Sequence, residues 1–194
     1  MKWLVAFIPM VAAAPGYIPL PDQNFGTPPP PGTVQIKGIT YGGNGCPQGT
    51  MSSQLSNDRT TVTLIFDSYI ASIGPGIAVT EQRKNCQLNV AITYPGGFQY
   101  SILSADYRGY ANLQKGTTTQ YDFVGPVIGD YLKHDEADST SVVWSPCGAE
   151  GMLNINSQVR MTATNTSATG LLTTDSTDLK FAQVVYVQWQ ACKK

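Results

Sequence analysis

Apolar and polar residues alternate with a period of two through most of the chain beyond residue 33, and this pattern constrains the fold most. In CQLNVAITY, 86–94, the even positions are apolar, whereas glutamine, asparagine and threonine point the other way. MLNINSQVRMTA, 152–163, shows the same alternation at its odd positions. Successive side chains of a strand point to opposite faces, so these segments predict antiparallel strands with one buried and one solvated face. Since no comparable three-to-four spacing is sustained, helix should be minor.

Clusters of glycine, proline, asparagine and aspartate divide the chain at the intervals typical of an all-β protein. Many short strands with such corners predict a two-sheet antiparallel β-sandwich or jelly roll rather than a parallel α/β fold. The closing segment AQVVYVQWQAC, 182–192, is apolar on both faces around residues 184–187, which predicts a central strand. We expect nine or ten strands, near 34–41, 50–56, 60–70, 86–94, 98–107, 109–114, 119–124, 141–146, 152–164 and 181–190.

The first thirteen residues predict a signal peptide, because Lys2 precedes an apolar core and a run of small residues. Cleavage after Ala13 is expected, since cleavage after Ala14 would place Pro15 in the disfavoured next position. A buried N-terminal strand is the alternative. No other stretch approaches the roughly 20 apolar residues of a membrane-spanning helix. The sequence therefore predicts a secreted, extracellular protein without membrane insertion.

Residues 14–33 form a proline-rich segment that contains four consecutive prolines, 28–31. Such a run has no backbone donors for a helix or a strand ladder and adopts an extended polyproline conformation. We interpret it as a propeptide or a stiff exposed arm; a ligand for proline-binding domains is the rarer alternative. The folded β-sandwich domain is expected to span 34–194.

The four cysteines are an even number in a chain with a leader, which predicts two disulfides. A zinc site is not expected, because Cys₄ sites use closely spaced cysteines. Four cysteines allow three disulfide connectivities. Each disulfide that closes a loop of about 40 residues would stabilise the fold by roughly 3–4 kcal/mol. Within YGGNGCPQGT, 41–50, the first strand is expected to turn into a hairpin that a disulfide pins to a neighbour. We favour one bond in each half of the domain, Cys46–Cys86 and Cys147–Cys192.

The surface chemistry excludes some partners. The chain has 12 basic and 13 acidic residues and no long basic run, so neither nucleic acid nor an anionic membrane is expected as principal partner. The tripeptide NTS, 165–167, predicts N-glycosylation at Asn165, although such tripeptides also arise by chance.

Several motifs together resemble the secreted fungal and bacterial proteins of the DUF4360 family. The resemblance runs from about residue 36 to residue 192 and includes all four cysteines. It implies a secreted, disulfide-bonded domain of a filamentous fungus and supplies no activity or site residue. The motifs are GNGCPQGT, RKNCQLNVAITYPGGFQYSI, ADYRGYANL, WSPCGAEGMLNIN, DSTD and VQWQAC.

The segment ADYRGYANL is the strongest candidate for ligand binding. Strand geometry places Asp106, Arg108 and Tyr110 on one face and Tyr107 on the other. A guanidinium can hydrogen-bond sugar hydroxyls, and an aromatic ring can stack on the apolar face of a sugar. The alternative is a cross-strand ion pair flanked by tyrosines that pack at its rim. Arg83 and Arg160 permit the same two interpretations.

Catalytic and metal-binding signals are weak. A Ser–His–Asp relay would have to use His134, whose acidic neighbours instead predict a solvated turn. One histidine also excludes multi-histidine metal sites. The acidic segments 133–139 and 173–178 offer oxygen ligands suited to calcium, though acidic loops are usually only hydrated. We expect no cofactor and leave a structural calcium open.

The sequence thus favours a secreted binding or structural module associated with cell-wall polysaccharide. A secreted effector or inhibitor that binds another protein is one alternative. A hydrolase that uses two carboxylates is another, although no spacing marks such a pair. Trp144 and Trp189 lie in strand-like runs and are expected in the core.

Overall fold

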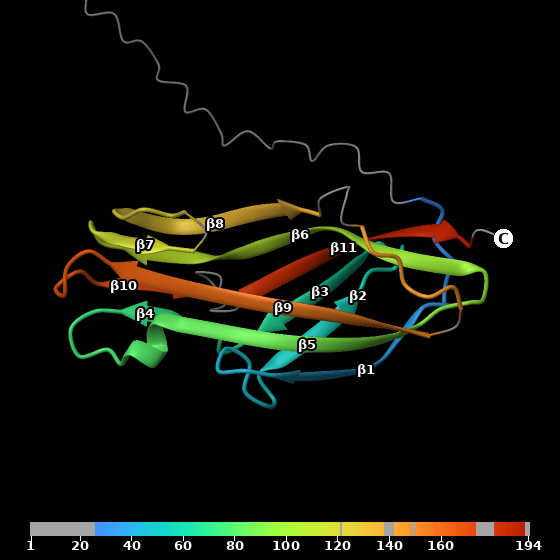
Figure 1. Cartoon of the computed structure of the whole chain (residues 1–194), viewed down its shortest axis with the longest axis horizontal. Coiled ribbons are helices and arrows are strands. Elements are labelled where there is room, and N and C mark those ends of the chain that lie inside the picture. The colour runs from blue at the N-terminus through green and yellow to red at the C-terminus, as the bar shows by residue number, and fades with distance from the viewer. Residues whose placement is uncertain (1–25, 121, 138–141, 149, 174–180, 193–194) are drawn as a thin grey trace, which may run out of the picture.

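A computed structural model describes residues 26–120, 122–137, 142–148, 150–173 and 181–192, which form eleven strands and one short 3₁₀ helix. Two antiparallel sheets face each other, with β5 and β9 in front of β11, β3 and β2 (Figure 1). The predicted two-sheet, all-β fold is confirmed. The elements are β1 Gln35–Gly42, β2 Met51–Leu55, β3 Thr61–Phe66, β4 Ala71–Ile73, η1 Val79–Gln82, β5 Arg83–Thr93, β6 Phe98–Leu113, β7 Thr117–Thr119, β8 Val127–Glu136, β9 Glu150–Ala163, β10 Gly170–Thr173 and β11 Phe181–Ala191.

The four-stranded sheet has the order β1-β5-β9-β7, and the seven-stranded sheet has the order β2-β3-β11-β6-β10-β4 with β8 also paired to β6. The long strand β6 pairs first with β11 and, beyond Gly109, with β10, while β8 lies along its other edge. The segment β11 lies between β3 and β6, so the predicted central strand is confirmed.

The core lies between the sheets and consists of the apolar positions of the alternating segments. Each buried Val, Leu or Phe side chain contributes about 1.5–3 kcal/mol of hydrophobic stabilisation. At one end of the core, the rings of Tyr94, Tyr100 and Trp189 contact one another with centroids 5.4–5.7 Å apart. Gly151 lies against this cluster, where an added Cβ would come 2.9 Å from the Tyr100 ring. The main contributors from the two sheets are Val62, Leu64, Phe66, Leu88, Val90, Leu153, Val185 and Val187.

Both favoured disulfides, Cys46–Cys86 and Cys147–Cys192, are present. The first bond pins the glycine-rich corner after β1 to β5. The expected hairpin there is wrong, because β1 and β2 belong to different sheets and the corner carries the chain between them. Glycine is required at residue 45, since an added Cβ would lie 2.4 Å from the Tyr69 ring.

Other differences concern short or polar strands. The expected strands 98–107 and 109–114 are one continuous strand, and 142–146 contains no strand. The short strands β4 and β10 and the polar edge strand β8 were not predicted. Among the described residues, no helix has the length and apolar character needed to cross a membrane.

Candidate binding face of the four-stranded sheet

Amide side chains form a continuous row on the outer face of the four-stranded sheet. The outward positions of β5 and β9 pair in register, so an amide of one strand stands opposite an amide of the other at three successive levels. Directly opposite side chains in an antiparallel pair have Cβ atoms about 4.5–5.5 Å apart. We call these six residues the amide ladder: Asn85 and Gln158, Gln87 and Asn156, and Asn89 and Asn154.

Most of the ladder's hydrogen-bonding capacity is unused. Gln87, Asn154 and Asn156 are exposed, and their side chains make no hydrogen bond to any described residue. Asn89 Nδ2 donates only a long bond of 3.5 Å to Thr40 Oγ1. Each free amide offers two N–H donors and a carbonyl acceptor, so the face presents both kinds of group to a ligand.

Asparagine is depleted in β-strands, yet four of the ladder's six residues are asparagine. A strand needs only some polar residue at a solvated position, and threonine or a charged residue would suit the strand better. Departures from local preference of this kind concentrate at functional sites. The amide ladder is therefore a candidate for ligand binding rather than only a solvated face.

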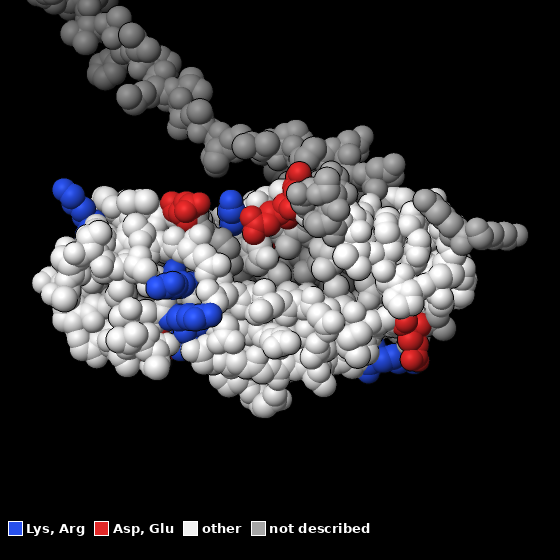
Figure 2. Space-filling model, viewed as in Figure 1, with Lys and Arg blue, Asp and Glu red and all other residues white. Residues whose placement is uncertain are grey.

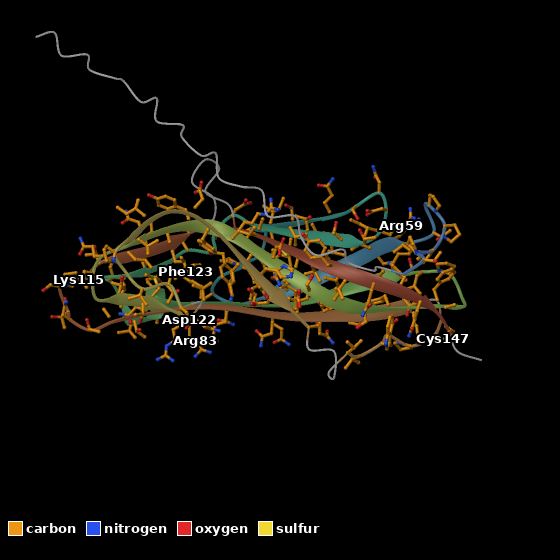
Figure 3. The ribbon with its side chains drawn as sticks, turned by 90° about the horizontal axis from the view of Figure 1, so that it is seen from above. Arg59, Arg83, Lys115, Asp122, Phe123 and Cys147 are labelled. Atoms are coloured by element: carbon orange, nitrogen blue, oxygen red, sulfur yellow. A yellow bond between two sulfur atoms is a disulfide. The ribbon has the colours of Figure 1, made fainter. Side chains whose placement is uncertain are left out.

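Charge lies at the two ends of this face. Arg83 and Arg160 stand opposite each other at one end, and Lys37 lines a pocket with Glu150 at the other. Figure 2 shows the same arrangement, with a wide uncharged surface between basic side chains on one side and a mixed pair on the other. In Figure 3, the Arg83 side chain points away from the sandwich, in the half of the molecule opposite Cys147.

Three shallow pockets adjoin the amide ladder. A pocket of about 430 Å³ at the arginine end is lined by Gln120, Gln158 and Arg160, together with threonines. A pocket of about 270 Å³ lies at the Glu150 end. A third, of about 390 Å³, contains Asn154 of the ladder and Trp144. Trp144 and one end of the amide ladder thus line the same pocket.

Trp144 is held by its neighbours in the chain. The Ser145 backbone N–H donates to Tyr100 O at 2.8 Å, and the Tyr100 N–H donates to Ser145 Oγ at 2.9 Å. The Tyr94 hydroxyl donates to Pro146 O at 2.8 Å, and Cys147 follows in its disulfide. Trp144 is half-buried in this irregular segment, so its predicted place in a core strand is wrong.

The predicted ligand residues of β6 lie on the other sheet. Asp106 is 1% exposed and is hydrogen-bonded to His134 and Tyr186, which favours the cross-strand pair over a sugar contact. Tyr107 packs against the core, and burial raises its pKa. Arg108 is exposed, and Tyr110 is half-buried. Their role in binding stays a prediction.

Arg83 is separated from these residues, because it lies at the end of the amide ladder. Its Nη2 donates to Gln158 Oε1 at 2.5 Å, and Gln158 Nε2 donates to Gln120 Oε1 at 2.9 Å. Of the predicted ligand residues, only Arg83 and Arg160 adjoin the ladder.

His134 lies in β8, so the expected solvated turn is wrong at this residue. Its Nδ1 is 2.5 Å from Asp106 Oδ1, and its Nε2 is 3.7 Å from Glu136 Oε1. Within the described part of the chain, no cluster of three or more His, Cys, Asp or Glu side chains could hold a metal ion. Asp175 and Asp178, named for calcium, lie outside the described residues.

Asn165 lies exposed in the turn after β9. Its Oδ1 accepts bonds from the backbone N–H groups of Ser167 at 3.0 Å and Ala168 at 2.7 Å. Glycosylation at this position stays a prediction.

The family to which this fold belongs is shown by comparison with known proteins. The profile of DUF4360, a domain of unknown function, matches residues 32–192. The chain belongs to the DUF4360 family. This DUF4360 protein is 56% identical over 189 residues to an uncharacterised secreted protein of Arthroderma benhamiae, with 89% of this chain and 77% of that protein covered. The predicted family and secretion are confirmed.

Among solved structures, the DUF4360 chain is similar to TmCBM61 in complex with beta-1,4-galactotriose. The TM-score is 0.22 and the identity 7%, with 81% of this chain and 91% of the other covered. A likeness at this level supports no conclusion about the DUF4360 protein.

The polar positions of the DUF4360 strands are evident in the sequence, but the ladder is not. A signal was present, because asparagine and glutamine recur at every second position in QLN, 87–89, and in NINSQ, 154–158. Only the register of β5 against β9 shows that these amides stand opposite one another.

Proposed function

We propose that this secreted protein binds a hydroxyl-rich cell-wall polysaccharide along the amide ladder. One observation carries the proposal: three consecutive cross-strand amide pairs form an outer surface without charge and with little internal hydrogen bonding. Every sugar hydroxyl is both a donor and an acceptor, and amides supply both partners without the desolvation cost of a charge.

The dimensions suit an extended ligand. Successive ladder pairs are two residues apart along each strand, so the three pairs span about 14 Å at roughly 3.4 Å per residue. A linear sugar chain can lie along this row and meet an amide pair at each level. Trp144 lies beside one end of the row and offers a ring for stacking on an apolar sugar face.

Binding is favoured over hydrolysis by the composition of the pockets. Glycoside hydrolysis needs two carboxylates at a set separation. The three pockets that adjoin the ladder contain a single carboxylate, Glu150. The buried carboxylate Asp106 is engaged by His134 and Tyr186 on the other sheet.

The test is a binding panel of chitin, β-glucan and cellulose with Asn89→Ala/Asn154→Ala. Loss of two neutral hydrogen bonds should weaken binding about tenfold, since each contributes roughly 0.5–1.5 kcal/mol. Asn112→Ala is the matched control, because Asn112 is an exposed strand asparagine on the other sheet. Equal retention of the double variant and the wild type would contradict the proposal, as would retention on none of the polysaccharides.

A further inference from the structure

Two arginines stand directly opposite each other at one end of the amide ladder. Arg83 of β5 pairs in register with Arg160 of β9, and both side chains are exposed. Like charges directly opposite in a sheet are destabilising. The chain has only 12 basic residues, so a high density of basic residues does not explain why two of them stand opposite each other.

Neither guanidinium forms an ion pair with a carboxylate among the described residues. The acidic residue nearest to Arg83 in sequence is Glu81, whose Oε2 lies 2.8 Å from Lys84 Nζ. Two like charges thus stand opposite each other, and no carboxylate of the described residues lies within ion-pair distance of either guanidinium. An anionic ligand would supply the missing charge.

A polar recess adjoins the pair on the side of Arg160. The side chain of Gln158 accepts a bond from Arg83 and donates one to Gln120, which limits its freedom and that of Arg83. The backbone N–H of Gln120 donates to Arg160 O at 2.9 Å. The recess of about 430 Å³ is also lined by Thr119 and Thr162. Guanidinium groups bind planar oxyanions through paired, charge-assisted hydrogen bonds.

We infer that the Arg83–Arg160 pair binds the anionic group of an acidic sugar in the polysaccharide that the amide ladder holds. The inference rests on the proposed function, because the recess continues the same face: Gln158 belongs to both. The anion is a uronate carboxylate or a sulfate ester, which share this recognition chemistry. An acidic peptide also carries carboxylates, but it lacks the series of hydroxyl groups that the amide ladder would bind.

The test measures binding of cello- and laminari-oligosaccharides in three forms: neutral, oxidised to a carboxylate at the primary hydroxyl, and sulfated. At low salt, the wild type should bind an anionic form at least about tenfold more tightly than its neutral parent. The variant Arg83→Gln/Arg160→Gln should lose this difference and keep its affinity for the neutral form. Preference for only one anionic form identifies the carboxylate or the sulfate as the natural group.

Lys115→Gln is the control, because Lys115 is exposed in the turn between β6 and β7 and forms no ion pair with a described carboxylate. It should keep the preference for the anionic forms. Thermal unfolding should confirm that the double variant folds, since removing the like-charge pair should leave its stability unchanged or higher.

The outcomes separate the two proposals. Equal affinity for neutral and anionic forms, or an anionic preference that survives the double substitution, would overturn the inference and leave the proposed function standing. Binding of polyglutamate as tightly as the uronate form would overturn the assignment to a sugar. Binding of no oligosaccharide would overturn both.

Discussion

His134 Nδ1 lies 2.5 Å from Asp106 Oδ1 across the β6–β8 pair, although 28 positions separate the two residues in the sequence. The buried Asp106 carboxylate also accepts a bond from the Tyr186 hydroxyl at 2.8 Å. One carboxylate therefore connects three neighbouring strands, β8, β6 and β11, on the face opposite the amide ladder.

His134→Ala should destabilise the fold by about 2–3 kcal/mol, because it removes one partner of a buried carboxylate. Urea unfolding at neutral pH measures this loss. Asp135→Asn is the control; Asp135 is an exposed neighbour 3.8 Å from Lys133, and its substitution should cost under about 1 kcal/mol. Equal stability of His134→Ala and the wild type would show that the pair is dispensable.

Trp144→Ala should weaken polysaccharide binding several-fold, since an aromatic contact contributes about 0.5–1.5 kcal/mol. Trp144→Phe should retain part of the affinity, because a ring remains. Leu132→Ala removes an exposed apolar side chain from the other sheet and should change nothing. If all three variants bind as the wild type does, Trp144 takes no part in binding.

The two disulfides should differ in their effect on binding. Cys46→Ser/Cys86→Ser and Cys147→Ser/Cys192→Ser open loops of similar length, 40 and 45 residues, so each should cost roughly 3–4 kcal/mol. Only the second disulfide anchors the segment that carries Trp144. Below the unfolding transition, only the second variant should therefore bind glycan less well, as titration calorimetry can test. Equal loss in both variants would contradict this distinction.

The alkaline limit of stability should depend on the buried tyrosines, because burial raises the pKa of Tyr69, Tyr107 and Tyr131 as well as that of Tyr100. Burial, and secondarily the neighbouring Tyr94, raises the pKa of Tyr100 to about 12. Because the folded-state pKa lies above the unfolded value of about 10, the neutral ring contributes stability below pH 10, and this contribution is lost as the pH rises toward 12.

Tyr100→Phe should flatten this loss in urea unfolding measured between pH 8 and pH 11. The Tyr100 hydroxyl has no hydrogen-bond partner among the described residues, so the substitution should change stability by under about 0.5 kcal/mol at neutral pH. An unchanged alkaline slope would show that other groups control it.

The sequence predicted the long strands because each buries one face, and period-two alternation records that burial directly. The segments around 86–94 and 152–163 became β5 and β9 for this reason. The sequence does not predict β8, because β8 is an edge strand with exposed Ile128 and Leu132. Its alternation of apolar and polar residues is therefore weak. β4 and β10 are too short to show a period.

The site depends on pairing between distant segments, which no local pattern contains. Asn89 and Asn154 are each visible as polar strand residues, but their juxtaposition follows from the β5–β9 register. Arg83 and Arg160 are ligand candidates by residue type alone. That they stand opposite each other, without a carboxylate of the described residues at ion-pair distance, is a property of the folded sheet.

The most direct test of the account is a glycan titration followed by ¹H–¹⁵N correlation NMR, because the side-chain NH₂ groups of asparagine and glutamine give their own signals. With a binding oligosaccharide, the account predicts shifts of the side-chain signals of Gln87, Asn89, Asn154 and Asn156, while the Asn112 signal stays in place. Shifts confined to the outer face of the seven-stranded sheet, around Arg108 and Tyr110, would contradict it.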